Sequence, residues 1–200
     1  IDKDMLYKFL REMEFNRLLS SVISAYGEPT LEKTKTEPIS KEKPLTIDKK
    51  NYYLITDEKQ IDDWINEAEE AGELAIDTET SSLDAHQAEL VGISLSTKIG
   101  KACYIPIGHN FKGCLKKVNV IKKLKPLLED KSVKKIGQNI KFDFIVLFKQ
   151  GINMNSMEDT MLMSYVLDAG KNRHNMDTLS EIHLQHKTIS FKEIVGTGKK

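Results

Sequence analysis

The feature that most limits how this chain can fold is a polar stretch at residues 27–50. It holds three of the five prolines, six lysines and five acidic residues, with few large apolar side chains. A segment of this composition cannot bury a hydrophobic core and is typical of a linker. It separates a helical segment, residues 1–26, from a compact domain that we expect over residues 51–200.

On both sides of the linker, the spacing of apolar residues predicts secondary structure. Residues 4–26 have helical spacing and no internal proline or glycine, which predicts one helix. In the compact domain, strands are expected at 52–55, 74–76, 89–96, 101–107 and 133–136, and helices at 57–71, 119–129, 140–149, 158–169 and 176–186. This order predicts an α/β fold, a mixed sheet of antiparallel and parallel strands flanked by helices.

Cysteine and apolar content narrow the class of protein further. Cys103 and Cys114 form no CxxC pattern and allow at most one bridge, so neither a disulfide framework nor a zinc knuckle is expected. No apolar run approaches the roughly eighteen residues of a membrane span, and the first residues do not resemble a signal peptide. We therefore expect no membrane partner and a reducing cytoplasm.

The formal net charge is zero, which argues against a nucleic-acid-binding domain if the charges are evenly spread. They are not: residues 51–100 hold twelve acidic and two basic residues, whereas residues 101–150 hold twelve basic and three acidic ones. The segregation is compatible with ion-paired packing of the two segments, or with an acidic metal site beside a basic surface. Charge alone does not choose between them.

Two acidic positions could carry chemistry. Asp77 and Glu79 follow a short apolar run, and residues i and i+2 of a strand point to the same side. Two close carboxylates need a cation or protons to offset their repulsion, and their hard oxygens suit Mg²⁺ or Mn²⁺. An isolated Asp-x-Glu is more often an ordinary solvated strand end.

A second candidate segment is Gly137–Leu147, where a strand ends and a helix begins. Asn139 is expected to be the helix N-cap, and Asp143 lies one turn into the helix. Taken alone, Asp143 is explained by its favourable interaction with the helix N-terminus.

Several short stretches of the sequence indicate a protein family far more specifically together than each does alone. AIDTETSSLD, LVGISL, YIPIGH, LKPLLED, GQNIKFD, EDTMLMSYVLD and RHNMDTLSEIHLQHKTISFKEIVGTGK occur in one order. In this order they resemble the 3′→5′ proofreading exonuclease domain of bacterial family A DNA polymerases, within the DEDD exonuclease superfamily. The resemblance covers about residues 52–200, and residues 4–24 resemble the last helix of the preceding 5′-nuclease region. It implies an RNase H-like fold, a bacterial cytoplasmic location, and polymerase and 5′-nuclease domains in the same parent chain.

The resemblance also implies an activity and its residues. The implied reaction is two-metal hydrolysis, with Mg²⁺ or Mn²⁺, at the 3′ end of single-stranded or frayed DNA, releasing nucleoside 5′-monophosphates. Asp77 and Glu79 match the first motif of the family and Asp143 the second, so these carboxylates are expected to be catalytic and to bind the metals. The side chains whose match implies contact with the DNA strand are Leu83, Gln138, Asn139, Arg173 and Phe191.

The match to the family is incomplete. Its third motif, a Tyr-x-x-x-Asp on a later helix, is not reached before Lys200, and Tyr165 and Asp168 have the wrong spacing. We therefore expect an active parent protein but weak or absent activity in this 200-residue chain. Two alternatives stay open: a non-catalytic structural or DNA-binding module of a polymerase, and an RNA-trimming exonuclease that resembles RNase D.

Overall fold

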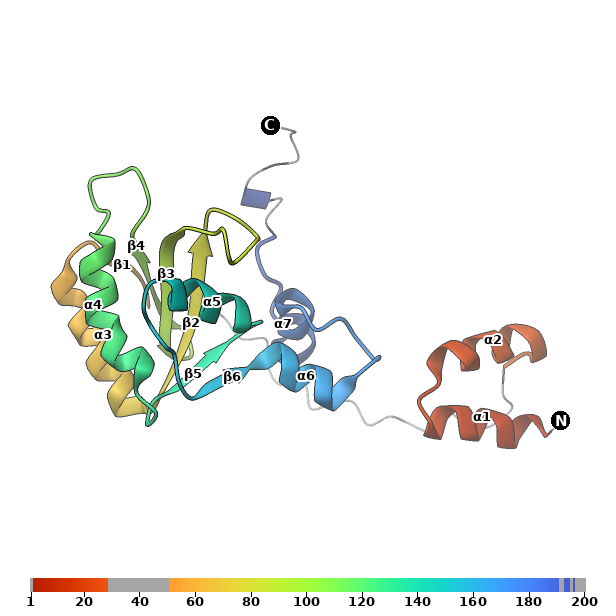
Figure 1. The fold of residues 1–200 in the computed structure, drawn as a ribbon. Coiled ribbons are helices and arrows are strands. Elements are labelled where there is room, and N and C mark those ends of the chain that lie inside the picture. The colour runs from red at the N-terminus through yellow and green to blue at the C-terminus, as the bar shows by residue number, and fades with distance from the viewer. Residues whose placement is uncertain (1, 29–50, 191–192, 195, 197–200) are drawn as a thin grey trace. The chain divides into compact units, whose positions relative to one another are not determined.

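The computed structural model describes residues 2–28, 51–190, 193–194 and 196 (Figure 1). The chain divides into two units, residues 1–43 and 44–200, and each is described by itself. Most of the expected linker, and Phe191 among the expected DNA contacts, lie outside the described residues. In the described part, no helix is both long and apolar enough to cross a membrane.

The N-terminal unit is a helical hairpin, so the prediction of one helix was wrong. It contains α1 (Lys3–Glu12) and α2 (Asn16–Tyr26). Between them, Glu14 adopts a left-handed conformation with φ of 55°, and the Phe15 backbone N–H donates to the Leu10 carbonyl at 2.9 Å. The Phe15 ring also packs edge-on against Phe9, with centroids 6.3 Å apart. The break depends on these contacts because neither glycine nor proline marks it.

The second unit is built on a six-stranded mixed sheet, which confirms the expected fold class. Its strands are β1 (Tyr52–Leu54), β2 (Glu73–Thr80), β3 (Leu90–Lys98), β4 (Lys101–Pro106), β5 (Lys134–Gly137) and β6 (Met157–Asp159). They lie in the order β1-β4-β3-β2-β5-β6. The pairs β2–β3 and β3–β4 are antiparallel, whereas β1–β4, β2–β5 and β5–β6 are parallel.

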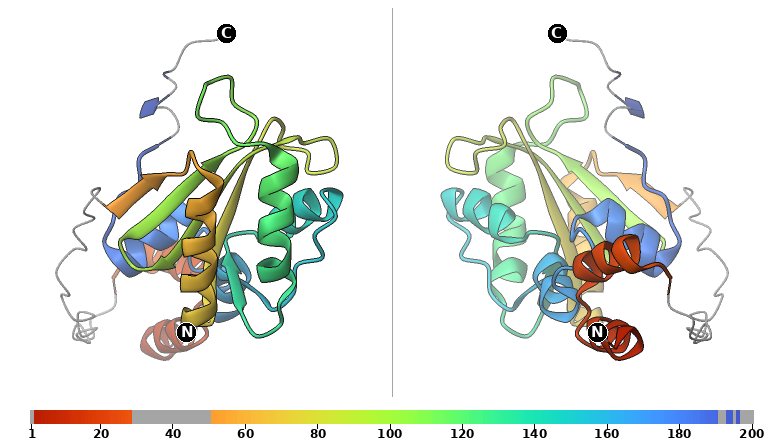
Figure 2. Two further views of the ribbon diagram at one scale, coloured as in Figure 1. Left: turned by 90° about the vertical axis from the view of Figure 1, so that its left-hand side faces the viewer. Right: turned by 90° about the vertical axis from the view of Figure 1, so that its right-hand side faces the viewer.

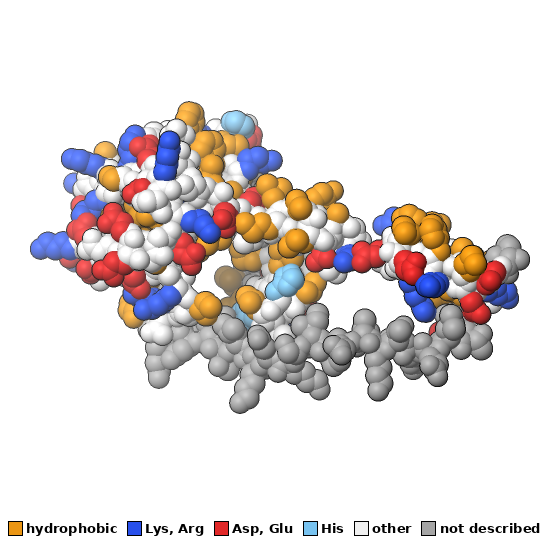
Figure 3. Space-filling model, turned by 90° about the horizontal axis from the view of Figure 1, so that it is seen from below, with side chains coloured by type: hydrophobic (Ala, Val, Ile, Leu, Met, Phe, Trp, Pro, Cys, Tyr) orange, Lys and Arg blue, Asp and Glu red, His pale blue; other side chains and the backbone are white. Residues whose placement is uncertain are grey.

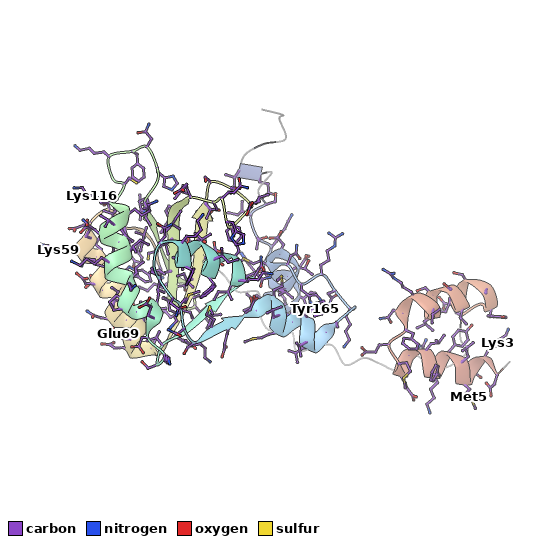
Figure 4. All side chains as sticks on the ribbon, viewed as in Figure 1. Lys3, Met5, Lys59, Glu69, Lys116 and Tyr165 are labelled. Atoms are coloured by element: carbon purple, nitrogen blue, oxygen red, sulfur yellow. The ribbon has the colours of Figure 1, made fainter. Side chains whose placement is uncertain are left out.

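The helices of this unit are α3 (Glu58–Ala71), α4 (Lys117–Glu129), α5 (Lys141–Lys149), α6 (Thr160–Asp168) and α7 (Met176–Leu184). Figures 1 and 2 show α3 and α4 side by side against the sheet. Their apolar sides form one core with the inward residues of the strands and of α5, which include Trp64, Leu74, Ile93, Leu124 and Leu147. The outer surface of α3 is polar, and Lys59 and Glu69 lie exposed on it (Figure 4).

The opposite charges of residues 51–100 and 101–150 meet within this unit. On α3, Asp62 pairs with Lys123 of α4 at 2.5 Å, and Glu67 pairs with Lys101 of β4. Asn119 of α4 donates to Glu58 of α3 at 2.6 Å. Part of the charge segregation therefore reflects polar packing between neighbouring elements, the simpler of the two interpretations.

One strand was not predicted. Residues 158–169 were expected to be helical, but β6 pairs with β5 before α6 begins at Thr160. The side chain of Asp159 caps α6 by accepting from the Met161 N–H at 2.9 Å and the Leu162 N–H at 3.4 Å. A three-residue strand is too short for its alternation to be read from the sequence.

Candidate active site

Asp77 and Glu79 lie on the same side of β2, as their spacing predicts. Leu74, Ile76 and Thr78 are buried along this strand, whereas Asp77 and Glu79 alternate with them and are exposed. The pairing of β2 with β3 shifts register between Glu79 and Thr80. Such a bulge re-aims a side chain, and bulges often lie beside active sites.

Asp143 reaches the same strand from α5, because β5 leaves part of the β2 edge unpaired. The parallel pairing ends at Ala75 and Ile136. Further along β2, Asp143 Oδ1 accepts the Thr78 backbone N–H at 2.9 Å and the Thr78 hydroxyl at 2.6 Å. Asp143 is only 3% exposed. A carboxylate from a helix thus takes the place of a neighbouring strand at this edge.

The three carboxylates influence one another electrostatically. Desolvation, and then the negative charges of Asp143 and Glu79, raise the pKa of Asp77 to about 6. Burial also raises the pKa of Asp143, although its two hydrogen bonds from Thr78 oppose that change. The site therefore concentrates negative charge that nothing in the described part of the chain neutralises, a pattern that marks functional sites.

The loop between β5 and α5 depends on a residue that the sequence analysis missed. Asp159 accepts the backbone N–H groups of Asn139 at 3.0 Å and Ile140 at 3.1 Å. Asn139 has a φ of 59°, so it is not the helix N-cap that was predicted, and Ile140 occupies that position. Because Asp159 also caps α6, one buried carboxylate joins two segments. The one feature of the sequence that could have indicated this role of Asp159 is its position near the start of a predicted helix.

Gln138 holds the segment before α7. Its amide group donates to the His174 carbonyl at 2.7 Å and accepts from the Thr160 hydroxyl at 2.5 Å. Arg173, next to His174, is exposed. A hollow of about 280 Å³ borders Asp77, and its lining includes Ser94, Gln138, Thr160 and Met176.

Leu83 lies in the loop after β2, four residues beyond Glu79, and is 99% exposed. A leucine in that state contributes almost nothing to the core. Asn139 is exposed as well. The structure thus leaves Leu83, Asn139 and Arg173 accessible, whereas the amide of Gln138 is engaged within the protein.

The site fits a divalent cation only in part. Among the described residues, no three Asp, Glu, His or Cys side chains form a group that could hold a metal ion by themselves. Mg²⁺, however, is usually bound by one or two carboxylates together with waters and substrate phosphates. Asp77 and Glu79 match that pattern. A cation there would offset the repulsion that, after desolvation, contributes to the raised pKa of Asp77.

Sequence comparison places these residues in a family. The family model for 3′-5′ exonuclease matches residues 52–200. DNA polymerase I of Rhizobium leguminosarum is 42% identical over 90% of this chain and 19% of its own length. DNA polymerase I of Pseudomonas aeruginosa is 38% identical over 99% of this chain and 22% of its own length. The chain thus spans about a fifth of these relatives.

Solved structures share the fold at low identity. The EXO domain of Nibbler from Aedes aegypti has a TM-score of 0.60 and 12% identity, over 78% of each chain. NrnC of Brucella melitensis with bound Mg²⁺ has a TM-score of 0.51 and 22% identity, over 75% of this chain and 69% of that one. They support the RNase H-like exonuclease fold.

The sheet, the carboxylates at its edge and these comparisons define a nuclease domain of the hydrolase class. The chain belongs to the 3′-5′ exonuclease family, and it is similar to the matching part of two bacterial DNA polymerase I sequences.

Proposed function

We propose that this domain hydrolyses the 3′-terminal phosphodiester of single-stranded or frayed DNA and releases nucleoside 5′-monophosphates. The observation that carries the proposal is the placement of Asp77 and Glu79 on one side of β2, with Asp143 bound to Thr78 between them in the strand. There desolvation first, and then the charges of Asp143 and Glu79, raise the pKa of Asp77 to about 6. The Mg²⁺ bound to NrnC, a neighbour in fold, supports a metal-dependent reaction.

Within this proposal, each carboxylate has a role. Asp77 would help to hold both of two Mg²⁺ or Mn²⁺ ions, Glu79 would hold the one that activates the attacking water, and Asp143 would hold or orient the one that serves the leaving group. Bound cations supply a water of lowered pKa and stabilise charge on the leaving 3′ oxygen. Thr78 keeps Asp143 in place through two hydrogen bonds.

The strand is held mainly by side chains without charge. Leu83 wedges between terminal bases, and Phe191 packs against them. Gln138 and Asn139 contact the terminal nucleotide, and Arg173 contacts a phosphate. Binding that depends on stacking against bases more than on phosphate contacts allows a strand end of any nucleotide sequence to bind. Of these side chains, the exposure of Leu83, Asn139 and Arg173 supports the proposal.

The surroundings of the domain are also proposed. Because the relatives are several times longer, we infer a cytoplasmic bacterial polymerase as parent, with polymerase and 5′-nuclease domains. Residues 1–26 end the 5′-nuclease region in this proposal, and residues 27–50 link it to the exonuclease domain.

The activity is tested by following mononucleotide release from a 3′-labelled single strand with Mg²⁺ or Mn²⁺. We expect nucleoside 5′-monophosphates, a requirement for metal, and less release from a fully paired end. Release that continues in EDTA, or internal cleavage of a strand blocked at its 3′ end, would contradict the proposal.

The same assay decides between the two other functions. Preference for an RNA strand over a DNA strand of the same sequence indicates an RNase D-like trimming enzyme. Absence of metal-dependent release, together with Mn²⁺ binding that is unaffected by Asp77→Ala, indicates a non-catalytic module. The identity with two DNA polymerase I sequences favours DNA.

We expect Leu83→Ala to weaken binding of a short single strand without affecting the fold. Because Leu83 is 99% exposed, the free energy of unfolding should change by less than about 0.5 kcal/mol. Loss of its contact with a base should weaken binding by about fivefold, or about 1 kcal/mol. Fluorescence anisotropy of a labelled strand in EDTA measures this binding without hydrolysis.

Ile99→Ala is the matched control, because Ile99 is 86% exposed in the turn between β3 and β4. This variant should bind the strand as the wild type does. Equal effects of the two substitutions would show that Leu83 has no special contact with the strand.

A further inference from the structure

The ring of Tyr104 on β4 occupies space that a side chain on β3 would need. A Cβ atom added to Gly92 would lie 1.8 Å from the Tyr104 hydroxyl oxygen and 2.3 Å from the ring carbon that carries it. The phenol therefore crosses β3 at the one position without a side chain. Any larger residue at 92 would force the tyrosine away.

Gly92 is also the direct partner of Glu79 in the antiparallel pairing of β2 and β3. Cβ positions of directly paired residues are roughly 5 Å apart and lie on the same face. The Tyr104 hydroxyl, at the Cβ position of Gly92, therefore lies beside Glu79. The side chain of Glu79 is long enough to span this gap, directly or through one water molecule.

The orientation of the phenol is fixed by a second residue. The Tyr104 hydroxyl and Nε2 of His109 are 2.6 Å apart, and their ring centroids are 5.6 Å apart. The ring of Phe111 packs on the other side of His109 at 6.2 Å. If His109 Nε2 carries the proton, it donates to the phenol oxygen and leaves the phenol proton for another acceptor.

The electrostatics agree with this arrangement. Burial first, and then the charge of Glu79, raise the pKa of Tyr104. The phenol therefore keeps its proton and remains a donor at neutral pH. After burial, the charge of Glu79 is the largest cause of that change, so the carboxylate of Glu79 is close enough to act on the phenol.

We propose that Tyr104, oriented by His109, is a positioning residue that donates a hydrogen bond to one carboxylate oxygen of Glu79 and turns the other toward the metal. The inference rests on the proposed role of Glu79. It adds to the site two residues that lie outside the first and second motifs, which hold the carboxylates, and that act through Glu79 without contact with substrate.

The first test needs no metal. In EDTA, the ¹³C carboxyl resonance of Glu79 should shift in Tyr104→Phe, because this change removes only the donor. The matched control is Tyr53→Phe, a strand tyrosine that packs against Trp64 with centroids 6.1 Å apart. The control should leave the resonance in place. A Glu79 resonance that does not respond to Tyr104→Phe would overturn the inference.

The second test measures Mn²⁺ affinity from the free-ion signal in electron paramagnetic resonance. Tyr104→Phe should weaken binding by about fivefold in the wild type but by less than about twofold in Glu79→Ala, because the hydroxyl acts through Glu79. His109→Ala should resemble Tyr104→Phe, and His109→Gln, which keeps a hydrogen-bonding group, should restore most of the affinity. Equal losses with and without Glu79, or unchanged affinity, would overturn the positioning role.

Failure of the proposed function has a different signature. If Asp77→Ala leaves Mn²⁺ binding unchanged, the carboxylates are not the metal site, and the proposed reaction loses its basis. The Glu79 resonance in EDTA still decides whether Tyr104 contacts Glu79.

Discussion

Asp77→Asn is expected to abolish metal-dependent hydrolysis and, at the same time, to stabilise the metal-free fold. The amide has no charge to attract a cation, so release of mononucleotides should fall about 10³-fold or to the level measured in EDTA, a loss of about 4 kcal/mol. Asp77→Asn should make the folded state more stable because it removes a carboxylate whose ionisation the fold disfavours. The native structure raises the pKa of Asp77 from 3.8 to about 6. Ionised Asp77 therefore destabilises the folded state.

The pH dependence of this gain has a definite sign. Well below pH 3.8, Asp77 is protonated in both the folded and the unfolded chain, and the substitution changes little. As the pH rises through 6, the unfolded chain has already released the proton, and the folded state loses the stability that its tighter proton binding supplied. Two pH units correspond to about 3 kcal/mol, which the exposure of Asp77 reduces to about 1–2 kcal/mol above pH 7.

Urea unfolding in EDTA at pH 4 and pH 8 measures this difference. Asp63→Asn on the exposed side of α3 is the control and should have no comparable effect at either pH. If Asp77→Asn is neutral or destabilising at pH 8, desolvation and neighbouring charges do not destabilise ionised Asp77, and the electrostatic argument for the site fails.

Asp143→Ala is expected to destabilise the domain by about 2–3 kcal/mol and to abolish hydrolysis as well. Removal of the carboxylate leaves two buried donors of Thr78 without a partner, and each unsatisfied group costs about 1–3 kcal/mol. Relief of the buried charge offsets part of this cost. Urea unfolding at pH 7 with a mononucleotide-release assay measures both effects.

Asp143→Asn separates the two roles of this residue. The asparagine keeps a carbonyl oxygen for Thr78, so the free energy of unfolding should stay within about 1 kcal/mol of the wild type. Hydrolysis should still be lost, because a neutral amide binds a divalent cation poorly. A stable Asp143→Asn variant with full activity would exclude Asp143 from the metal site.

The apolar side chains of α6 and α7 remain prominent on the surface of the second unit. Leu162, Val166 and Leu167 of α6 are 57%, 82% and 78% exposed, and Figure 3 shows hydrophobic side chains gathered on this side. Patches of this kind usually mark surfaces that another segment or protein covers.

Local patterns accounted for most of the second unit. The i, i+2 spacing of Asp77 and Glu79 predicted that both side chains lie on the same side of β2. The helical spacing of apolar residues predicted the positions of α3 and α4. These features depend on residues a few positions apart, so a short window of sequence contains the whole signal. The same does not hold for residues whose partners lie far away in the chain.

Asp143 illustrates the difference. The resemblance to polymerase exonucleases assigned it to the metal site, but the reason for its position is tertiary: β5 stops pairing early, and Thr78, 65 residues earlier, uses the free edge to bind it. Asp159, which holds the loop at Asn139, was missed for the same reason. The prediction of Asn139 as the helix N-cap was wrong for a related reason. Asp159, which is distant in the sequence, accepts the backbone N–H groups of Asn139 and Ile140.

Amino-acid order alone thus established the α/β class, the strand that carries two carboxylates, and the family. Three-dimensional packing decided which opposite charges meet, because it pairs Glu67 and Asp62 of α3 with lysines of β4 and α4. It also brought Tyr104 and His109 together, with the Tyr104 hydroxyl in the space where Gly92, the pairing partner of Glu79, has no side chain. Such proximity depends on strand register, which brings together residues that are far apart in the sequence. No short sequence pattern contains both residues of such a pair.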